Sequence, residues 1–266
     1  MRNPFNRHIP TLTFHKVDSS FEWGVTRITP SQFKRILEFF IRERYVTVSL
    51  RQCFNPAYVL PLKPVVITFD DSYESIYTHA FPLMETYGFT ATIFVITGYA
   101  GKFNTWDVNL GWRQFRHLSW DQIVQLKKAG FEIGSHTVHH PDLTRVHDHL
   151  LKGELENSKK QIEDKIGEGV HFISFPFGRY NTEVIEISKQ VGYQHGCGFW
   201  IRTLEKRLKE EFVFERKAYY LFDGIWNLKA KLSNNLLTSI EDVKLRIVNF
   251  CSQGTSLVKP VKIHFD

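Results

Sequence analysis

The sequence has few cysteines and no long apolar run, and both absences narrow what the protein can be. Its 266 residues include three cysteines, Cys53, Cys197 and Cys251. An odd number of widely spaced cysteines suits neither a disulfide framework nor a structural zinc site. No segment approaches the roughly 20 apolar residues of a membrane span, and residues 1–10 contain no apolar core of a signal peptide. As written, the chain is expected in the cytoplasm, or in the cell envelope or outside the cell if a leader was removed.

Concentrated positive charge is also missing. The formal net charge of +6 is mild for this length, and basic residues such as Lys206 and Arg207 lie among the acids Glu205 and Glu210. A nucleic-acid-binding surface needs a basic stripe, so no nucleic-acid partner is expected. The composition, 42% apolar and 23% charged, is ordinary for a globular protein. Because no linker or low-complexity segment interrupts the chain, residues 1–266 are expected to form a single domain.

What the sequence does contain is a regular alternation of strand and helix patterns. Strands are predicted over 9–15, 45–50, 65–69, 90–96, 131–135, 172–175, 193–198 and 212–214, with a closing strand over 257–265. Helices are predicted from residue 30, before 88, and over 119–129, 148–166, 181–192 and 225–250. Such alternation is typical of an α/β protein with a parallel sheet, and at this length of a barrel.

The stretch Val65–Tyr73 places two adjacent acids at the end of an apolar strand. Asp70 and Asp71 directly follow this strand, where α/β enzymes keep their catalytic groups. Neighbouring carboxylates repel each other, so a cation or an acid/base role is needed to make them tolerable. The alternative is structural, with Asp71 or Ser72 capping the next helix.

A histidine-rich segment follows another predicted strand. His136 and His140 are separated by three residues, which puts two imidazoles on one side of a turn. Together with an Asp from another strand end they would make a two-His, one-carboxylate set with open positions, as in catalytic metal sites. Either histidine alone would more often be a surface or core residue.

These motifs, in this order, resemble the polysaccharide deacetylase (NodB-homology) family of carbohydrate esterases. The resemblance rests on residues 68–71 (Thr-Phe-Asp-Asp), on His136-Thr137-x-x-His140-Pro141-x-Leu143 and on residues 175–178 (Phe-Pro-Phe-Gly), and it covers roughly 65–180. It implies a distorted (β/α) barrel of about seven parallel strands. It also implies hydrolysis of N-acetyl groups on an amino-sugar polymer or oligosaccharide.

The same resemblance implies roles for individual residues. Asp70 would be the general base, while Asp71, His136 and His140 would bind one divalent metal ion; the backbone N–H of Phe177 would help hold the oxyanion. Thr137 would brace the histidine loop. Zinc is the default expectation for the metal, and cobalt, nickel, iron or manganese also suit the ligand set.

The sequence departs from the common family pattern in two places. Ser174 replaces the Arg that usually orients the base, and residues 262–264 only loosely match the segment that usually supplies the acid, His264 here. In a branch resembling the poly-N-acetylglucosamine deacetylases, the acid His lies on the first strand and the Arg comes from a late strand. That branch implies His15 as general acid and Arg216 as partner of Asp70. Without it, a buried strand-end histidine and a solvated arginine are the alternatives.

Substrate contacts are predicted for four further residues. Trp106 and Trp112 lie in a long loop and are expected to stack on sugar rings, and Tyr73 and Pro176 lie beside the predicted catalytic groups. Two other functions remain open: hydrolysis of a non-sugar amide on the same fold, and an inactive carbohydrate-binding module. The second has no need of adjacent carboxylates.

Overall fold

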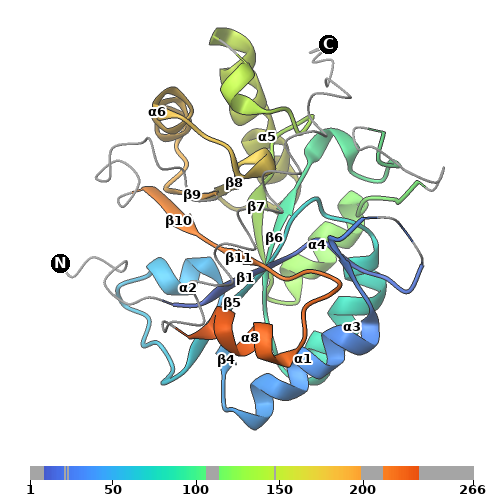
Figure 1. Ribbon diagram of the computed structural model, residues 1–266. Coiled ribbons are helices and arrows are strands. Elements are labelled where there is room, and N and C mark those ends of the chain that lie inside the picture. Colours follow the sequence, from blue (N-terminus) through green and yellow to red (C-terminus); the bar gives the residue numbers. More distant parts are fainter. Residues whose placement is uncertain are drawn as a thin grey trace.

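Strands and helices alternate along the part of the chain that the structure describes (Figure 1). The structure is a computed structural model, and it describes residues 9–20, 22, 24–105, 114–146, 148–198 and 212–233. The strands are β1 (Thr11–Phe14), β2 (Lys16–Val17), β3 (Arg27–Ile28), β4 (Val46–Thr47), β5 (Pro64–Phe69), β6 (Thr92–Val95), β7 (Glu132–Ser135), β8 (Phe172–Ser174), β9 (His195–Gly198), β10 (Val213–Glu215) and β11 (Lys217–Ala218). The α-helices are α1 (Pro30–Arg42), α2 (Leu50–Phe54), α3 (Phe81–Thr86), α4 (Trp120–Lys128), α5 (Asp148–Ile166), α6 (Thr182–Val191) and α8 (Ile225–Leu232).

The main sheet is parallel throughout and closes on itself through one short segment. Its strand order is β10-β9-β8-β7-β6-β5-β1-β11, with β4 added beside β5. β10 pairs with β9 and β11 pairs with β1, so the segment 213–218 joins both edges of the sheet. Counting β10 and β11 as one run, the ring has seven strands. This confirms the predicted (β/α) barrel, in which Figure 1 shows helices around the strands.

Local sequence signals explain where the predicted helices begin and end. Thr29 and Ser119 cap α1 and α4, and in each case a Gln three residues later completes a capping box. Asn181 caps α6, which ends at Gly192 with a φ of 97°. Only glycine adopts that backbone conformation without steric cost. These starts and ends were therefore predictable from the sequence.

The predicted strand over 45–50 is wrong in its second half. Only Val46 and Thr47 pair with β5, and Ser49 then caps α2 through a capping box with Gln52. The short α2 packs beneath the barrel, where Phe54 contacts Phe172 and Phe214. The alternation of apolar residues with Thr47 and Ser49 is typical of a strand, and it hid the helix start that Ser49 and Gln52 mark together.

The barrel interior changes from apolar to polar along its axis. Val66, Phe94 and Phe172 belong to one buried apolar cluster, while Thr68 and then Asp70 follow Val66 toward and just beyond the carboxyl end of β5. Gly134 on β7 makes room for this packing, because a Cβ there would lie 2.6 Å from the ring of Phe94. Asp70 therefore lies at the carboxyl end of β5, beyond this apolar cluster.

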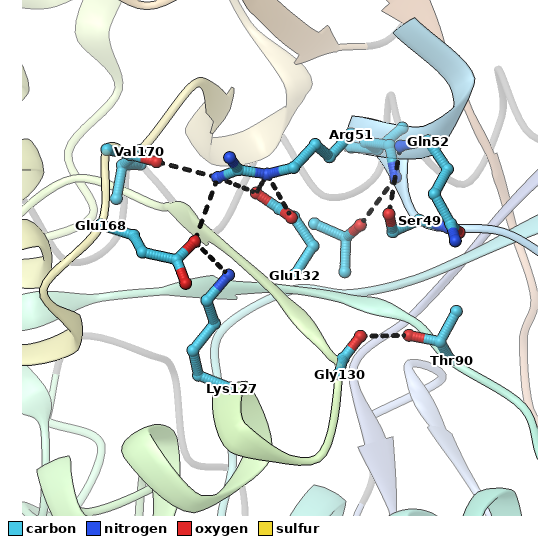
Figure 2. A network of polar contacts seen from close by, with 12 residues as sticks. Ser49, Arg51, Gln52, Thr90, Lys127, Gly130, Glu132, Glu168 and Val170 are labelled. Atoms are coloured by element: carbon cyan, nitrogen blue, oxygen red, sulfur yellow. Dashed lines mark hydrogen bonds and ion pairs between the residues drawn. The ribbon is translucent and has the colours of Figure 1, made fainter. Parts of the chain in front are cut away.

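An ionic network holds the opposite end of the barrel together (Figure 2). Arg51 on α2 donates to both carboxyl oxygens of Glu132, the first residue of β7, at 3.0 and 3.1 Å. Lys127 pairs with Glu168 at 2.9 Å. Because Glu132 is only 4% exposed, the two bonds from Arg51 pair a buried negative charge that would otherwise have no counter-charge. This network serves the stability of the barrel and lies away from the carboxyl ends of the strands.

The carboxyl-terminal predictions are covered only in part. α8 occupies the start of the predicted helix over 225–250, and the predicted strand over 257–265 lies outside the described residues. Within the described residues, no helix has the length and hydrophobicity to cross a bilayer.

Candidate active site

Asp70 and Asp71 point into two different environments at the end of β5. The strand pairs with β1 and β6 as far as Phe69, and the backbone then turns sharply, with φ angles of 64° at Asp71 and 52° at Ser72. These left-handed conformations exclude both residues as helix caps, since an N-cap has an extended backbone. Both carboxyl groups remain buried, each residue being 5% exposed. The structural alternative for this stretch is therefore wrong.

Asp70 is bound by the guanidinium group of Arg216. Nη1 of Arg216 donates to Oδ1 of Asp70 at 2.7 Å, and Nη2 donates to Oδ2 at 2.8 Å. Nη1 also donates to the hydroxyl of Thr68, and Nη2 to that of Ser174. Arg216 lies between β10 and β11, so the segment that closes the barrel also delivers this side chain. Ser174 and Arg216, which lie 42 residues apart in the chain, are thus in contact with each other and with Asp70.

Asp71, His136 and His140 form a separate buried cluster. Nε2 of His136 lies 3.3 Å from Oδ1 of Asp71, and Nε2 of His140 lies 3.5 Å from the same atom. The three candidate ligand atoms all fall within 4.8 Å of one another. This is the two-His, one-carboxylate set predicted from the sequence, brought together from the ends of β5 and β7.

The donor atoms of this cluster fit a cation. Nδ1 of His136 lies 2.7 Å from the carbonyl oxygen of Ser174, and since a carbonyl only accepts, Nδ1 carries the proton. With Nδ1 protonated, Nε2 is the nitrogen that faces Asp71: it donates to the carboxylate when the ring is protonated, and it offers a lone pair to a cation when the ring is neutral. Lone pairs and negative charge converging on one point need a proton or a metal ion between them. Hydrogen-bonding the far nitrogen of a ligand histidine in this way is typical of metal sites.

Burial and neighbouring charges shift the pKa values of the ionisable groups in the site. Burial alone would raise the pKa of Asp70, but the Arg216 guanidinium more than reverses this, and the pKa of Asp70 lies below its usual value. Burial likewise opposes ionisation of Asp71, yet the hydrogen bond from His136 brings the pKa of Asp71 well below its usual range. Burial and the neighbouring His136 lower the pKa of His140 to about 3. Both carboxyl groups are therefore ionised at neutral pH.

His15 lies at the end of β1 and faces the same charges. Burial lowers the pKa of His15, while the carboxylates of Asp71 and Asp70 act in the opposite direction. Its Nδ1 is buried and has no hydrogen-bond partner among the described residues. His15 is thus a half-buried imidazole next to two carboxylates. Its predicted role as general acid stays a prediction.

Backbone strain is concentrated at this site. Six non-glycine residues among those described have a positive φ, and five of them belong to the loops just discussed or adjoin them: Asp71, Ser72, Thr137, His140 and Phe177. Such conformations cost on the order of 1–3 kcal/mol each and persist only where surrounding contacts enforce them. Their accumulation at the ends of β5, β7 and β8 supports a functional reading of this end of the barrel.

Of the remaining predicted residues, some lie beside the cluster, one is almost fully buried, and three lie outside the described residues. The Phe177 ring lies 4.8 Å from that of His140, next to the candidate metal ligands, and Pro176 is buried beside it. Tyr73 is only 2% exposed and stacks on His117 at 4.8 Å, which leaves little of its ring for a sugar. Trp106, Trp112 and His264 lie outside the described residues.

Sequence reasoning missed His117. Its Nδ1 donates to the backbone carbonyl oxygen of Asp71 at 2.6 Å, and burial lowers the pKa of His117 to about 4, so that the ring is neutral at neutral pH. This hydrogen bond holds the backbone of Asp71 in its left-handed conformation. His117 lies 46 residues from Asp71 in an irregular loop, and no spacing rule links the two.

Comparison with known proteins gives consistent matches. A family model described as polysaccharide deacetylase matches residues 59–196. The Bacillus subtilis protein YxkH, assigned by name to the polysaccharide deacetylases, is 29% identical over 71% of this chain and 63% of its own length. A poly-beta-1,6-N-acetyl-D-glucosamine N-deacetylase of Staphylococcus aureus is 26% identical over 64% of this chain and 60% of its own length. This chain thus spans about three fifths of these curated relatives.

Solved structures agree on the fold. The deacetylase PplD of Streptococcus pyogenes, determined in complex with acetate, superposes with a TM-score of 0.72 at 23% identity, covering 85% of this chain and 98% of that one. IcaB from Ammonifex degensii superposes with a TM-score of 0.60 at 22% identity, covering 71% and 83%.

Proposed function

The chain belongs to the polysaccharide deacetylase family, and we propose that it removes N-acetyl groups from an amino-sugar polymer or oligosaccharide with the help of one divalent metal ion. The observation that carries this proposal is the division of labour between two adjacent carboxylates. Asp70 is fixed by Arg216, and Asp71 meets two histidines. Asp70 is thereby available as a base, while Asp71 would bind the metal ion.

In the proposed reaction, Asp71, His136 and His140 would hold the metal ion. When bound, such an ion lowers the pKa of a coordinated water and polarises the acetamide carbonyl. Zinc is the expected ion, since two imidazoles and one carboxylate with open positions are common zinc ligands. The Nδ1–H of His136, donated to Ser174, fixes the tautomer that this role requires.

Asp70 would accept the proton of the attacking water at a carboxylate oxygen. Its two bonds from Arg216 hold the carboxylate in one plane, so that the proton-accepting lone pairs have a fixed direction. The backbone N–H of Phe177, in a turn with φ 58°, would donate to the oxyanion of the tetrahedral intermediate. His15 would give a proton to the leaving amine nitrogen, after which the C–N bond breaks and acetate and the free amine remain.

Acetate release after metal removal tests the proposal. The protein is stripped with a chelator and supplied with β-1,6-linked N-acetylglucosamine oligomers, because a relative is named for that polymer. We expect no acetate from the stripped protein and recovery of acetate release on adding zinc or another divalent metal. Binding of the sugar without acetate release under any metal would instead indicate a binding module. Release of acetate only from small non-sugar acetamides would indicate an amidase.

A further inference from the structure

The loop that presents the two candidate histidine ligands is held in an unusual conformation. Residues 136–140 follow β7 and adopt neither helix nor strand. Thr137 has a φ of 68° and His140 a φ of 59°, conformations that residues other than glycine rarely adopt. Something outside the loop must therefore enforce its shape.

Side chains accept all four successive backbone N–H groups from Thr137 to His140. The N–H of Thr137 donates to the hydroxyl of Ser135 at 3.1 Å, and the N–H of His140 donates to the hydroxyl of Thr137 at 3.0 Å. The two amides between them, of Val138 and His139, both donate to Oε2 of Glu154 at 3.0 Å. Ordinary secondary structure would satisfy these groups through backbone carbonyls. In this loop, side-chain oxygens accept these hydrogen bonds instead.

Glu154 is the acceptor that comes from outside the loop. It lies on α5 and is fully buried, with 0% exposure. Its second carboxyl oxygen, Oε1, accepts a bond from Nδ1 of His139 at 2.6 Å. One buried carboxyl group thus receives three hydrogen bonds from two consecutive residues located between the candidate ligands His136 and His140.

We propose that Glu154 is a positioning residue for the metal site: it holds the loop so that His136 and His140 converge on Asp71. The inference deepens the proposed function and rests on it only in assuming that these three residues bind a metal. Glu154 is not one of the clustered candidate ligands, and both its oxygens accept hydrogen bonds from Val138 and His139. It acts through the backbone of the loop.

The physical reason is that both amides depend on the same buried oxygen, Oε2 of Glu154. If the Glu154 oxygens are removed, the amides of Val138 and His139 are left buried without a partner or must turn toward water. Turning them rotates the peptide planes on either side, and the left-handed conformations of Thr137 and His140 lose their support. The two imidazoles then no longer share one target point, and metal affinity falls.

Glu154→Met tests the idea, because methionine fills a similar volume without accepting hydrogen bonds. Zinc affinity is measured by chelator competition on the whole chain, and we expect a loss of about 10–100-fold, the usual size for removing a supporting contact behind a ligand. Glu154→Gln should recover affinity to within about threefold of the parent. Its carbonyl oxygen can still accept the two amides, and His139 can change tautomer to accept from its NH₂ group.

The matched control is Ile162→Ala, two turns further along α5. Ile162 is buried in the main core, so this variant lowers the melting temperature without touching the loop. We expect its zinc affinity to stay within about threefold of the parent. If Ile162→Ala lost as much affinity as Glu154→Met, the effect would be general destabilisation and the proposal would be wrong. Unchanged affinity in Glu154→Met would overturn it equally.

A second measurement does not depend on metal or on catalysis. In the metal-free protein, the amides of Val138 and His139 should exchange slowly with solvent in the parent and in Glu154→Gln. In Glu154→Met, or in Glu154→Asp if the methionine variant does not fold, they should exchange at least tenfold faster. Equal protection in all variants would refute the role of Glu154. Suppose that Glu154→Met loses both protection and metal affinity, but the parent protein releases no acetate from any sugar. The role of Glu154 would then stand, and only the proposed deacetylation would be refuted.

Discussion

Arg216 donates two parallel hydrogen bonds to Asp70, although the two residues lie 146 positions apart in the chain. The bond lengths of 2.7 and 2.8 Å are those of a charge-assisted, bidentate pair. The ring of Phe94 lies 5.3 Å from the guanidinium carbon, and Gly134 leaves the space for that ring. The orientation of the proposed base is therefore built from β5, β6, β7 and the segment that closes the barrel.

Replacing Arg216 with Lys should impair turnover more than folding. A lysine ammonium keeps the charge but cannot bind both carboxylate oxygens in one plane, so the proposed base loses its fixed orientation. We expect kcat/KM for acetate release to fall by about 10–100-fold, as for other residues that orient a reacting group from behind.

Arg51→Lys is the matched control for this variant. Arg51 makes the same bidentate contact with Glu132 at the other end of the barrel (Figure 2). We expect it to lower the melting temperature while leaving kcat/KM within about twofold. Equal losses of kcat/KM in the two variants would contradict a specific role for Arg216.

Asp70→Asn and Asp71→Asn should separate catalysis from metal binding. Asn at position 70 cannot accept the proton of the attacking water, so turnover should fall by about 10²–10⁴-fold, the usual contribution of a general base, with zinc affinity little changed. Asn at position 71 removes the negative ligand shared by His136 and His140, so zinc affinity should fall. Chelator competition and acetate release, measured on both variants, check this; the reverse pattern would exchange the two assignments.

The Asp70–Arg216 pair should make stability depend on pH in the acid range. The pKa of Asp70 is lower in the folded protein than its usual value of 3.8, so the unfolded chain binds the proton more readily. The pair's stabilisation is then fully present above about pH 4 and is lost as the pH falls through the folded pKa. Urea unfolding of the metal-free protein between pH 7 and 3 measures this.

Asp70→Asn gives the comparison for that measurement. Removing one partner of a buried ion pair costs about 3–5 kcal/mol, so the variant should be less stable than the parent by that order at pH 7. The gap should narrow below pH 4. A gap that stays constant or widens in acid would show that the carboxylate of Asp70 does not stabilise the fold.

His15→Ala should matter only when the leaving group needs a proton. Release of a sugar amine requires protonation of nitrogen, and loss of a general acid typically costs 10²–10⁴-fold. An aryl acetate such as 4-nitrophenyl acetate leaves without protonation, so its hydrolysis by His15→Ala should stay within about threefold of the parent. Equal loss on both substrates, or full activity of His15→Ala on the sugar, would exclude His15 as the acid; His264→Ala is then the variant to measure.

Many helix ends and strands could be predicted from local sequence signals. The capping boxes at Thr29 and Ser119 and the left-handed Gly192 fixed helix ends that the sequence alone predicts. The strand at 65–69 and the histidine spacing predicted which residues would meet, because parallel strands deliver their carboxyl ends to the same edge. The error at 45–50 arose because the helix cap Ser49 lies within a strand-like alternation of apolar and polar residues.

The sequence by itself determined the barrel, the pair of acids at the end of β5 and the two histidines after β7, because periodicity, capping and spacing are local properties of the chain. Only the tertiary structure decided which groups surround each acid. It brought Arg216 to Asp70 through barrel closure, set His117 against the backbone of Asp71, and placed Glu154 beneath the histidine loop. These contacts join residues 15 to 146 positions apart, and they arise from the closing of the sheet and the docking of α5, which no local pattern encodes.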